Sequence, residues 1–246
     1  MTELSEPYAD EFEEIPSAEN LESAVDSLIE SLARSVEDLD MSPDFEDGVV
    51  GVRRDANALA VVAMTLGASD YDSPLQGVVT DLLESANLVE QAKSGAEVKK
   101  AYQQIVAVRA KTGKAKKLDW KKVAALHPLM KYAVPSLATD VKRLTRNEKT
   151  FLRGKNTRKV IDDSTILVAI ALGCRENVED TLAPSEEKLW LQYCERLASA
   201  SLELNKQANL LADKKGSFDD LKAAAKEVEA TCNSTCHEKF GGKSAQ

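Results

Sequence analysis

The chain repeats itself, and this repeat constrains the fold more than any other feature of the sequence. Three segments of the first half recur in the same order in the second half: 24–36 with 133–145, 55–72 with 162–179, and 90–106 with 212–228. In the middle pair both copies run through an apolar stretch that ends in Leu-Gly, at Leu66-Gly67 and at Leu172-Gly173. Three matches in one order predict a tandem duplication of about a hundred residues.

Each copy is predicted to form four amphipathic helices. Apolar residues recur at steps of three and four, which is the pattern of a helix buried on one side. The expected helices lie near 18–40, 44–67, 75–89 and 98–105 in the first copy, and near 121–147, 149–173, 185–213 and 217–240 in the second. No strand-like alternation competes, and the 246 residues include only 11 Gly and 7 Pro. We therefore expect an all-α fold of two tandem up-down four-helix bundles.

The distribution of charge divides the chain further. Sixteen Asp and Glu but one Arg fall within residues 1–50 of a chain whose net charge is −9. We expect an acidic flexible N-terminus over 1–16, a first bundle over 17–113 and a second over 118–242, with a lysine-rich linker near 111–119 between them. The basic stretches 93–122 and 142–159 either dock an anionic partner or form solvated connectors. The overall acidity argues against a nucleic-acid partner.

Membrane and export signals are both missing from the sequence as given. No stretch reaches the roughly 18 apolar residues that a membrane-spanning helix needs. The first residues, MTELSEPYADEFEEIPS, are acidic and have no apolar core of a signal peptide. We expect either a cytoplasmic protein or one whose leader precedes this sequence.

The segment EATCNSTCHEKF (229–240) contains the most chemically distinctive residues. It continues the apolar stripe of the last predicted helix, and that stripe consists of Leu221, Ala224, Ala225 and Val228. Four-residue spacing places Cys232 and Cys236 next on the same face. His237 follows, rotated by about 100° around the helix axis. The usual attachment pattern for c-type haem is C-x-x-C-H, in which the thiols form thioethers and the histidine binds iron; here three residues separate the cysteines.

The segment 230–240 resembles the C-terminal haem segment of the cytochrome c prime family, in which Cys-His is followed two residues later by Phe. The resemblance covers about residues 120–242 and is specific at Cys232, Cys236, His237 and Phe240. It implies one covalent haem c, held by the two thiols with His237 as the proximal iron ligand and Phe240 beside it. The first copy has AVRAKTGK (107–114) at the corresponding place, so it is a haemless sister bundle by the same resemblance.

The resemblance also assigns the opposite face of the iron to the first helix of the second bundle, which carries LHPLMKYAV (126–134). Met130 as sixth ligand would suit electron transfer, because thioether ligation raises the reduction potential. An apolar cover such as Leu129 would leave the iron open to small gases. An ordinary core methionine is the simpler interpretation of Met130, and a capping role is the simpler interpretation of His127.

Other interpretations of the cysteines remain open. Cys232 and Cys236 form either a disulfide, which is strained on one regular helix, or plain core thiols beside a helix-end histidine. A zinc site would need a fourth ligand from Cys174, Cys194 or His127. Cys174 and Cys194 either pair in an oxidising compartment or stay as buried thiols.

The expected function is that of a c-type monohaem cytochrome in the periplasm or another exported location. It would transfer electrons to a redox partner protein or bind a gas such as nitric oxide or carbon monoxide, without substrate turnover. The resemblance also implies pairing of two chains through exposed helix faces. The alternative is a haemless helical-bundle interaction or adaptor protein, in which the Cys/His motif is decayed or structural.

Overall fold

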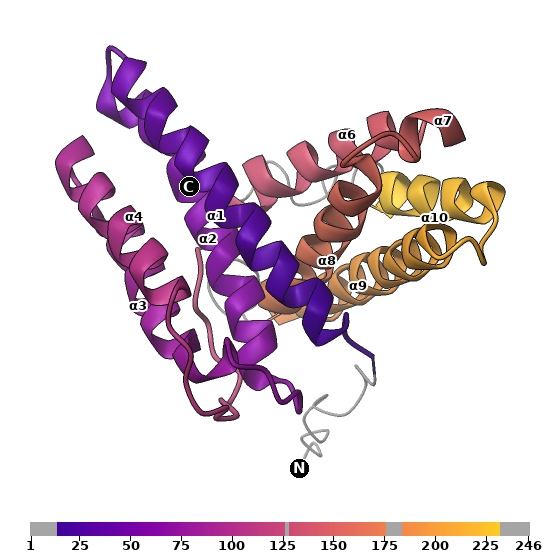
Figure 1. Cartoon of the computed structure of the whole chain (residues 1–246), viewed down its shortest axis with the longest axis horizontal. Helices are drawn as coiled ribbons and strands as arrows, with labels where there is room; N and C mark the ends of the chain where they lie inside the picture. Colours follow the sequence, from indigo (N-terminus) through magenta and orange to yellow (C-terminus); the bar gives the residue numbers. More distant parts are fainter. Residues whose placement is uncertain (1–13, 126–127, 176–183, 232–246) are drawn as a thin grey trace.

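A computed structural model describes residues 14–125, 128–175 and 184–231 (Figure 1). All regular structure in these residues is helical, so the predicted all-α fold is confirmed. The elements are α1 (Ala18–Met41), α2 (Phe45–Ala68), the 3-10 turn η1 (Gln76–Val78), α3 (Val79–Gln91), α4 (Gly95–Arg109), the π-helical turn η2 (Leu129–Ala133), α6 (Val134–Leu144), α7 (Glu148–Phe151), α8 (Asn156–Arg175), α9 (Pro184–Ala212) and α10 (Phe218–Thr231).

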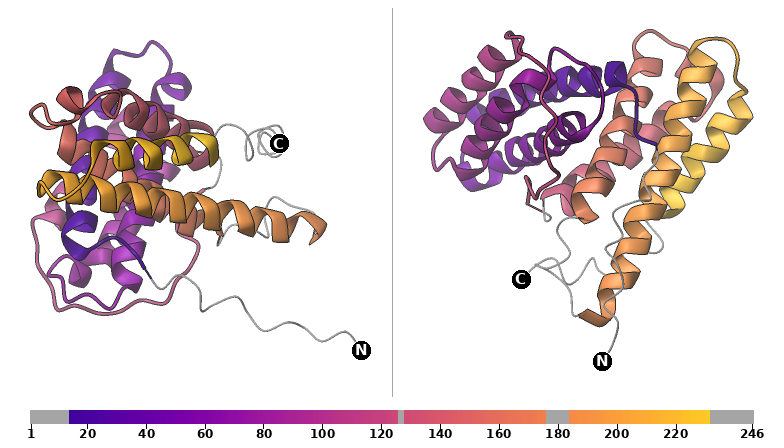
Figure 2. Two further views of the ribbon diagram at one scale, coloured as in Figure 1. Left: turned by 90° about the vertical axis from the view of Figure 1, so that its right-hand side faces the viewer. Right: turned by 90° about the horizontal axis from the view of Figure 1, so that it is seen from below.

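The long helices pack in two closed groups of four. In the first group α1 contacts α2 and α4, and α3 contacts α2 and α4. In the second group α8 contacts α6 and α9, and α10 contacts α9 and α6. Figure 2 shows the two groups side by side, and one hydrophobic core runs through both of them. The domain limits 17–113 and 118–242 stay predictions.

Helices α2 and α8 join the two groups. Both α1 and α2 pack against α8. Nearly every residue of α2 from Asp55 to Gly67, and of α8 from Val160 to Cys174, is buried. Neighbouring helices surround both stretches, which are largely apolar but also bury polar residues such as Asp55 and Asp163. A Cβ atom added to Gly173 would lie 2.6 Å from Val61 Cγ1, so α2 and α8 meet with no room for a side chain at that point.

The first two helices begin almost where the sequence predicts, because each has a side-chain cap. The Ser17 hydroxyl accepts a hydrogen bond from the Asn20 backbone N–H. The Asp44 carboxylate accepts bonds from the backbone N–H groups of Glu46 and Asp47. Serine and aspartate at this position satisfy amide groups that have no partner within the helix.

The first half of the second copy differs from the prediction. Of the helix expected over 121–147, residues 121–125 are not helical. Helical structure is described from Pro128, passes through the π-helical turn η2 and continues into α6, whose first turn contains Pro135. The helix expected over 149–173 is broken after α7, because Gly154 has a left-handed φ of +56°. Only glycine adopts that conformation readily. The chain therefore turns before α8 begins.

Residues 110–125, which we call the strap, have no helical structure and lie along the first group of helices. The backbone N–H of Gly113 donates to the Pro74 carbonyl at 3.2 Å, and that of Leu118 donates to the Gly67 carbonyl at 2.7 Å. The Leu118 side chain packs against the core. The lysine-rich linker is thus attached to the helices by backbone hydrogen bonds and apolar contact.

Substitution of Gly113 by alanine is expected to loosen the strap. The added Cβ would lie 2.7 Å from the Gly77 carbonyl oxygen and 2.9 Å from its carbon, where backbone cannot give way easily. We expect a loss of about 1–3 kcal/mol in the free energy of unfolding, as for overpacking elsewhere. Urea unfolding measures this loss, and the rate of tryptic cleavage after Lys117 measures the local release.

Gly95→Ala is the matched control, because nothing lies within 4 Å of a Cβ at that position of α4. It should leave both measurements unchanged or slightly raise stability. Equal tryptic rates for the two variants would show that the backbone contact does not hold the strap.

Candidate functional site

The residues predicted to face the iron lie at one end of the second group of helices. Leu129 is fully buried, whereas Met130 is half-buried and packs against the core. The Cys174 thiol donates to Met130 Sδ at 3.3 Å. Trp190 Nε1 donates to the Cys174 carbonyl at 2.9 Å. Cys174 and Cys194 are buried thiols that form no disulfide with each other.

The predicted attachment residues Cys232, Cys236, His237 and Phe240 lie outside the described residues, as does His127. The stripe that leads to them is confirmed, because Leu221, Ala224, Ala225 and Val228 are all buried. Within residues 14–125, 128–175 and 184–231, no group of three or more His, Cys, Asp or Glu side chains could hold a metal ion. Haem attachment and the zinc alternative both stay predictions.

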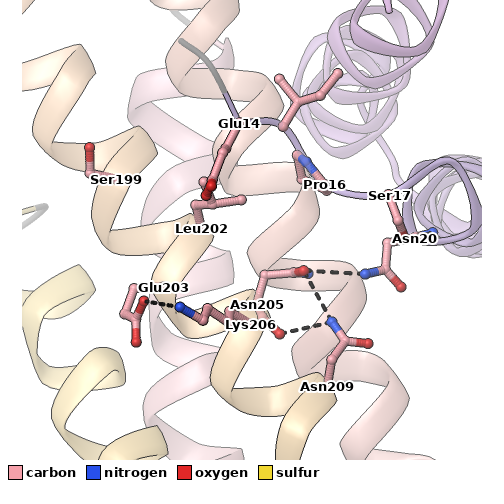
Figure 3. Close-up of a pocket in the computed structure, with 11 residues that line it drawn as sticks. Glu14, Pro16, Ser17, Asn20, Ser199, Leu202, Glu203, Asn205, Lys206 and Asn209 are labelled. Atoms are coloured by element: carbon pink, nitrogen blue, oxygen red, sulfur yellow. Dashed lines mark hydrogen bonds and ion pairs between the residues drawn. The ribbon is translucent and has the colours of Figure 1, made fainter. Parts of the chain in front are cut away.

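A groove with a volume of about 560 Å³ lies between residues 14–20 and α9 (Figure 3). Its lining combines apolar, amide, hydroxyl and charged side chains: Glu14, Ile15, Pro16, Ser17, Asn20, Ser199, Leu202, Glu203, Asn205, Lys206 and Asn209. No motif in the sequence marks these residues as a site. The one sequence signal that could have indicated the groove is the presence of polar residues, Asn20 and Asn205, on the apolar faces of predicted helices.

Asn205 anchors the floor of this groove. Its side chain is 4% exposed, and its Nδ2 donates to the Ile161 carbonyl at 3.1 Å, to Ser164 Oγ at 3.1 Å and to Thr165 Oγ1 at 2.9 Å. The Ile161 carbonyl can only accept, so the NH2 end of the amide must face α8. The orientation of Asn205 therefore follows from its contacts.

The orientation of Asn205 determines the orientation of two further amides. Its Oδ1 accepts from Asn20 Nδ2 at 3.2 Å and from Asn209 Nδ2 at 3.1 Å. Asn209 Nδ2 also donates to the Asn205 carbonyl at 2.8 Å. Figure 3 shows the oxygens of Asn20 and Asn209 on the side away from Asn205. One network thus joins α1, α8 and α9 and presents two amide oxygens from residues that line the groove.

A partly buried ionic cluster connects α6 and α8. Asp163 is 1% exposed, and Lys159 Nζ lies 3.0 Å from its Oδ1 and 3.0 Å from Asp140 Oδ2. Burial raises the pKa of Asp163 to about 7, against the opposing effect of Lys159. Within the described part of the chain, no hydrogen bond or ion pair links this cluster to the groove lining. We therefore assign the cluster a role in stability.

Comparison with known proteins gives no relative: no family model, no curated protein and no solved structure matches the chain. Among the described residues, no helix combines the length and apolar character needed to cross a lipid bilayer. The assignment of function therefore depends on the geometry of the chain itself.

Asp163→Asn should flatten the pH dependence of stability. The folded-state pKa of Asp163, about 7, lies above its ordinary value of 3.8, so the folded protein holds a proton that the unfolded chain releases. Stability then falls as pH rises through this interval and is constant above it. Between about pH 5 and about pH 8 we expect the wild type to lose roughly 1–3 kcal/mol more than the variant, measured by urea unfolding.

The exposed Asp72→Asn is the control and should follow the wild-type curve. A constant difference in stability between wild type and Asp163→Asn over the whole range would show that Asp163 is ionised throughout.

Proposed function

We propose that the chain is a non-catalytic helical binding module whose site is the groove between residues 14–20 and α9. The observation that carries this proposal is the amide network beneath the groove, in which Asn205 orients Asn20 and Asn209 from two different helices. Buried polar groups cost free energy unless they are hydrogen-bonded, and here the bonds between them hold the floor in one arrangement. The groove needs no rearrangement to present it.

The walls and the floor of the groove suit binding rather than reaction. Ile15, Pro16 and Leu202 offer apolar surface, and the amides offer directed polar contacts. Binding sites of this size combine apolar walls with a few oriented polar groups. Preorganised groups also reduce the entropy lost when a partner binds. A segment of a partner protein is the expected occupant.

Leu202→Trp tests this function by filling the groove. Leu202 is half-buried in the lining, so a larger side chain can occupy the groove without entering the core. We expect wild-type protein to bind a subset of short synthetic peptides on an array of mixed composition, and the variant to lose most of that binding. Thermal unfolding of both proteins checks that the fold is kept.

Leu88→Trp is the matched control, since Leu88 is 46% exposed on α3 and lies outside the groove lining. It should bind the same peptides as the wild type. If Leu202→Trp and Leu88→Trp give the same pattern as the wild type, the groove is not the binding site.

A second candidate is the c-type monohaem cytochrome, which transfers electrons or binds a small gas outside the cytoplasm. It is favoured by the buried stripe of α10, because the four-residue spacing in the sequence continues from Val228 to Cys232, which lies outside the described residues. Met130 adds a half-buried thioether, a chemically suitable iron ligand.

Export into a compartment that attaches c-type haem tests this candidate. If the proposal holds, haem stays with the chain through denaturation, and the doubly substituted Cys232→Ala, Cys236→Ala protein carries none. A pyridine-haemochrome spectrum and the intact mass measure both. An exported wild-type chain with the mass of the bare polypeptide would eliminate the cytochrome and leave the binding module.

A further inference from the structure

The amide groups of Asn20 and Asn209 in the groove use their nitrogens within the protein and leave their oxygens for a ligand. Asn20 and Asn209 both direct their NH2 groups to Asn205 Oδ1. In the described part of the chain, neither of their side-chain oxygens accepts a hydrogen bond from protein, and both residues line the groove. The amides of the floor therefore offer two oxygen acceptors to a ligand. Asn209 uses both of its N–H groups within the network, whereas Asn20 uses one of its two.

The charged groups of the lining reinforce this preference. Glu14 and Glu203 contribute two carboxylates, and Lys206 contributes one ammonium group. Lys206 Nζ lies 4.0 Å from Glu203 Oε2, and both side chains are more than half exposed. A pair of this length at the surface is weak, so Glu203 can exchange it for a better partner. Gln207 Nε2 donates to the other oxygen of Glu203 at 2.7 Å and holds the carboxylate in place.

From these contacts we infer that the groove takes the guanidinium group of an arginine in a basic segment of a partner protein. A guanidinium has five N–H donors and no acceptor, so it complements a site that supplies carboxylate and amide oxygens. It can bind a carboxylate through two parallel hydrogen bonds, which an ammonium group cannot. An anionic ligand would meet the same oxygens with repulsion. The inference rests on the proposed binding function and adds the chemistry of the partner.

The remaining lining accommodates the rest of an arginine side chain. Its methylene groups can lie along apolar surface while the charged end stays at the polar floor, and Ile15, Pro16 and Leu202 supply that surface. The net charge of −9 favours the approach of a basic segment at low ionic strength.

Titration of the full-length chain with the blocked tripeptide acetyl-Gly-Arg-Gly-amide tests the inference. Amide NMR spectra of ¹⁵N-labelled protein follow the side-chain NH2 signals of Asn20, Asn205 and Asn209. We expect saturable shifts of these signals, with a dissociation constant on the order of millimolar for one side chain. The matched probe is the same tripeptide with citrulline, which keeps the shape and loses the charge, and it should bind at least about tenfold more weakly.

Glu203→Gln should weaken binding of the arginine tripeptide by about three- to tenfold. Glu187→Gln, at an exposed position of α9 outside the groove lining, should leave it unchanged. Equal binding of the arginine and citrulline tripeptides at the groove would overturn the choice of a cation and leave the binding function standing. No shift at the groove with either probe, together with peptide-array binding that Leu202→Trp does not alter, would overturn both.

Discussion

The contact between α2 and α8 is the constraint on which the rest of the molecule depends. Each of these helices is buried on nearly all sides, so neither can exist without a full set of neighbours. Helix α2 packs against α1 and α3 of its own group and against α8 of the other, and α8 packs against α6 and α9 of its own group and against α1 and α2 of the other. Gly173 allows the two helices to approach closely, because any side chain at position 173 would collide with Val61. Helices α3, α4, α6, α9 and α10 are then arranged around this central pair.

The polar network of the groove depends on the same arrangement. Asn20 lies on α1 in the first group of helices, whereas Asn205 on α9 and its partners on α8 belong to the second. The amides meet only because α1 packs on α8. The groove between residues 14–20 and α9 therefore depends on the packing of the two groups of helices against each other.

The sequence was sufficient to predict the helices and their buried faces, because stripes such as Leu221 to Val228 record the period of a helix directly. It was not sufficient for breaks that depend on one backbone angle, as at Gly154, where a lysine- and glycine-containing stretch reads equally well as helix. Asn205 was visible as a polar residue on a buried face. Its partners on α1 and α8, however, lie 40 to 185 positions away in the chain, and no local pattern identifies them. The Cys232–His237 motif gave the sharpest chemical prediction, and it stays one because those residues lie outside the described part.

The strap binds the first group of helices through hydrogen bonds and apolar contact, although it leads into the second group. Its Ala125 N–H donates to Asn57 Oδ1 at 2.6 Å, and Leu118 packs next to Gly67. The strap, which precedes the second group of helices, is thus part of the surface of the first. A fragment that ended at Arg109 would expose the Gly67 carbonyl and remove the partner of Asn57 on this side. The strap therefore ties the two groups of helices together, so that a cut between them would also break contacts of the first group.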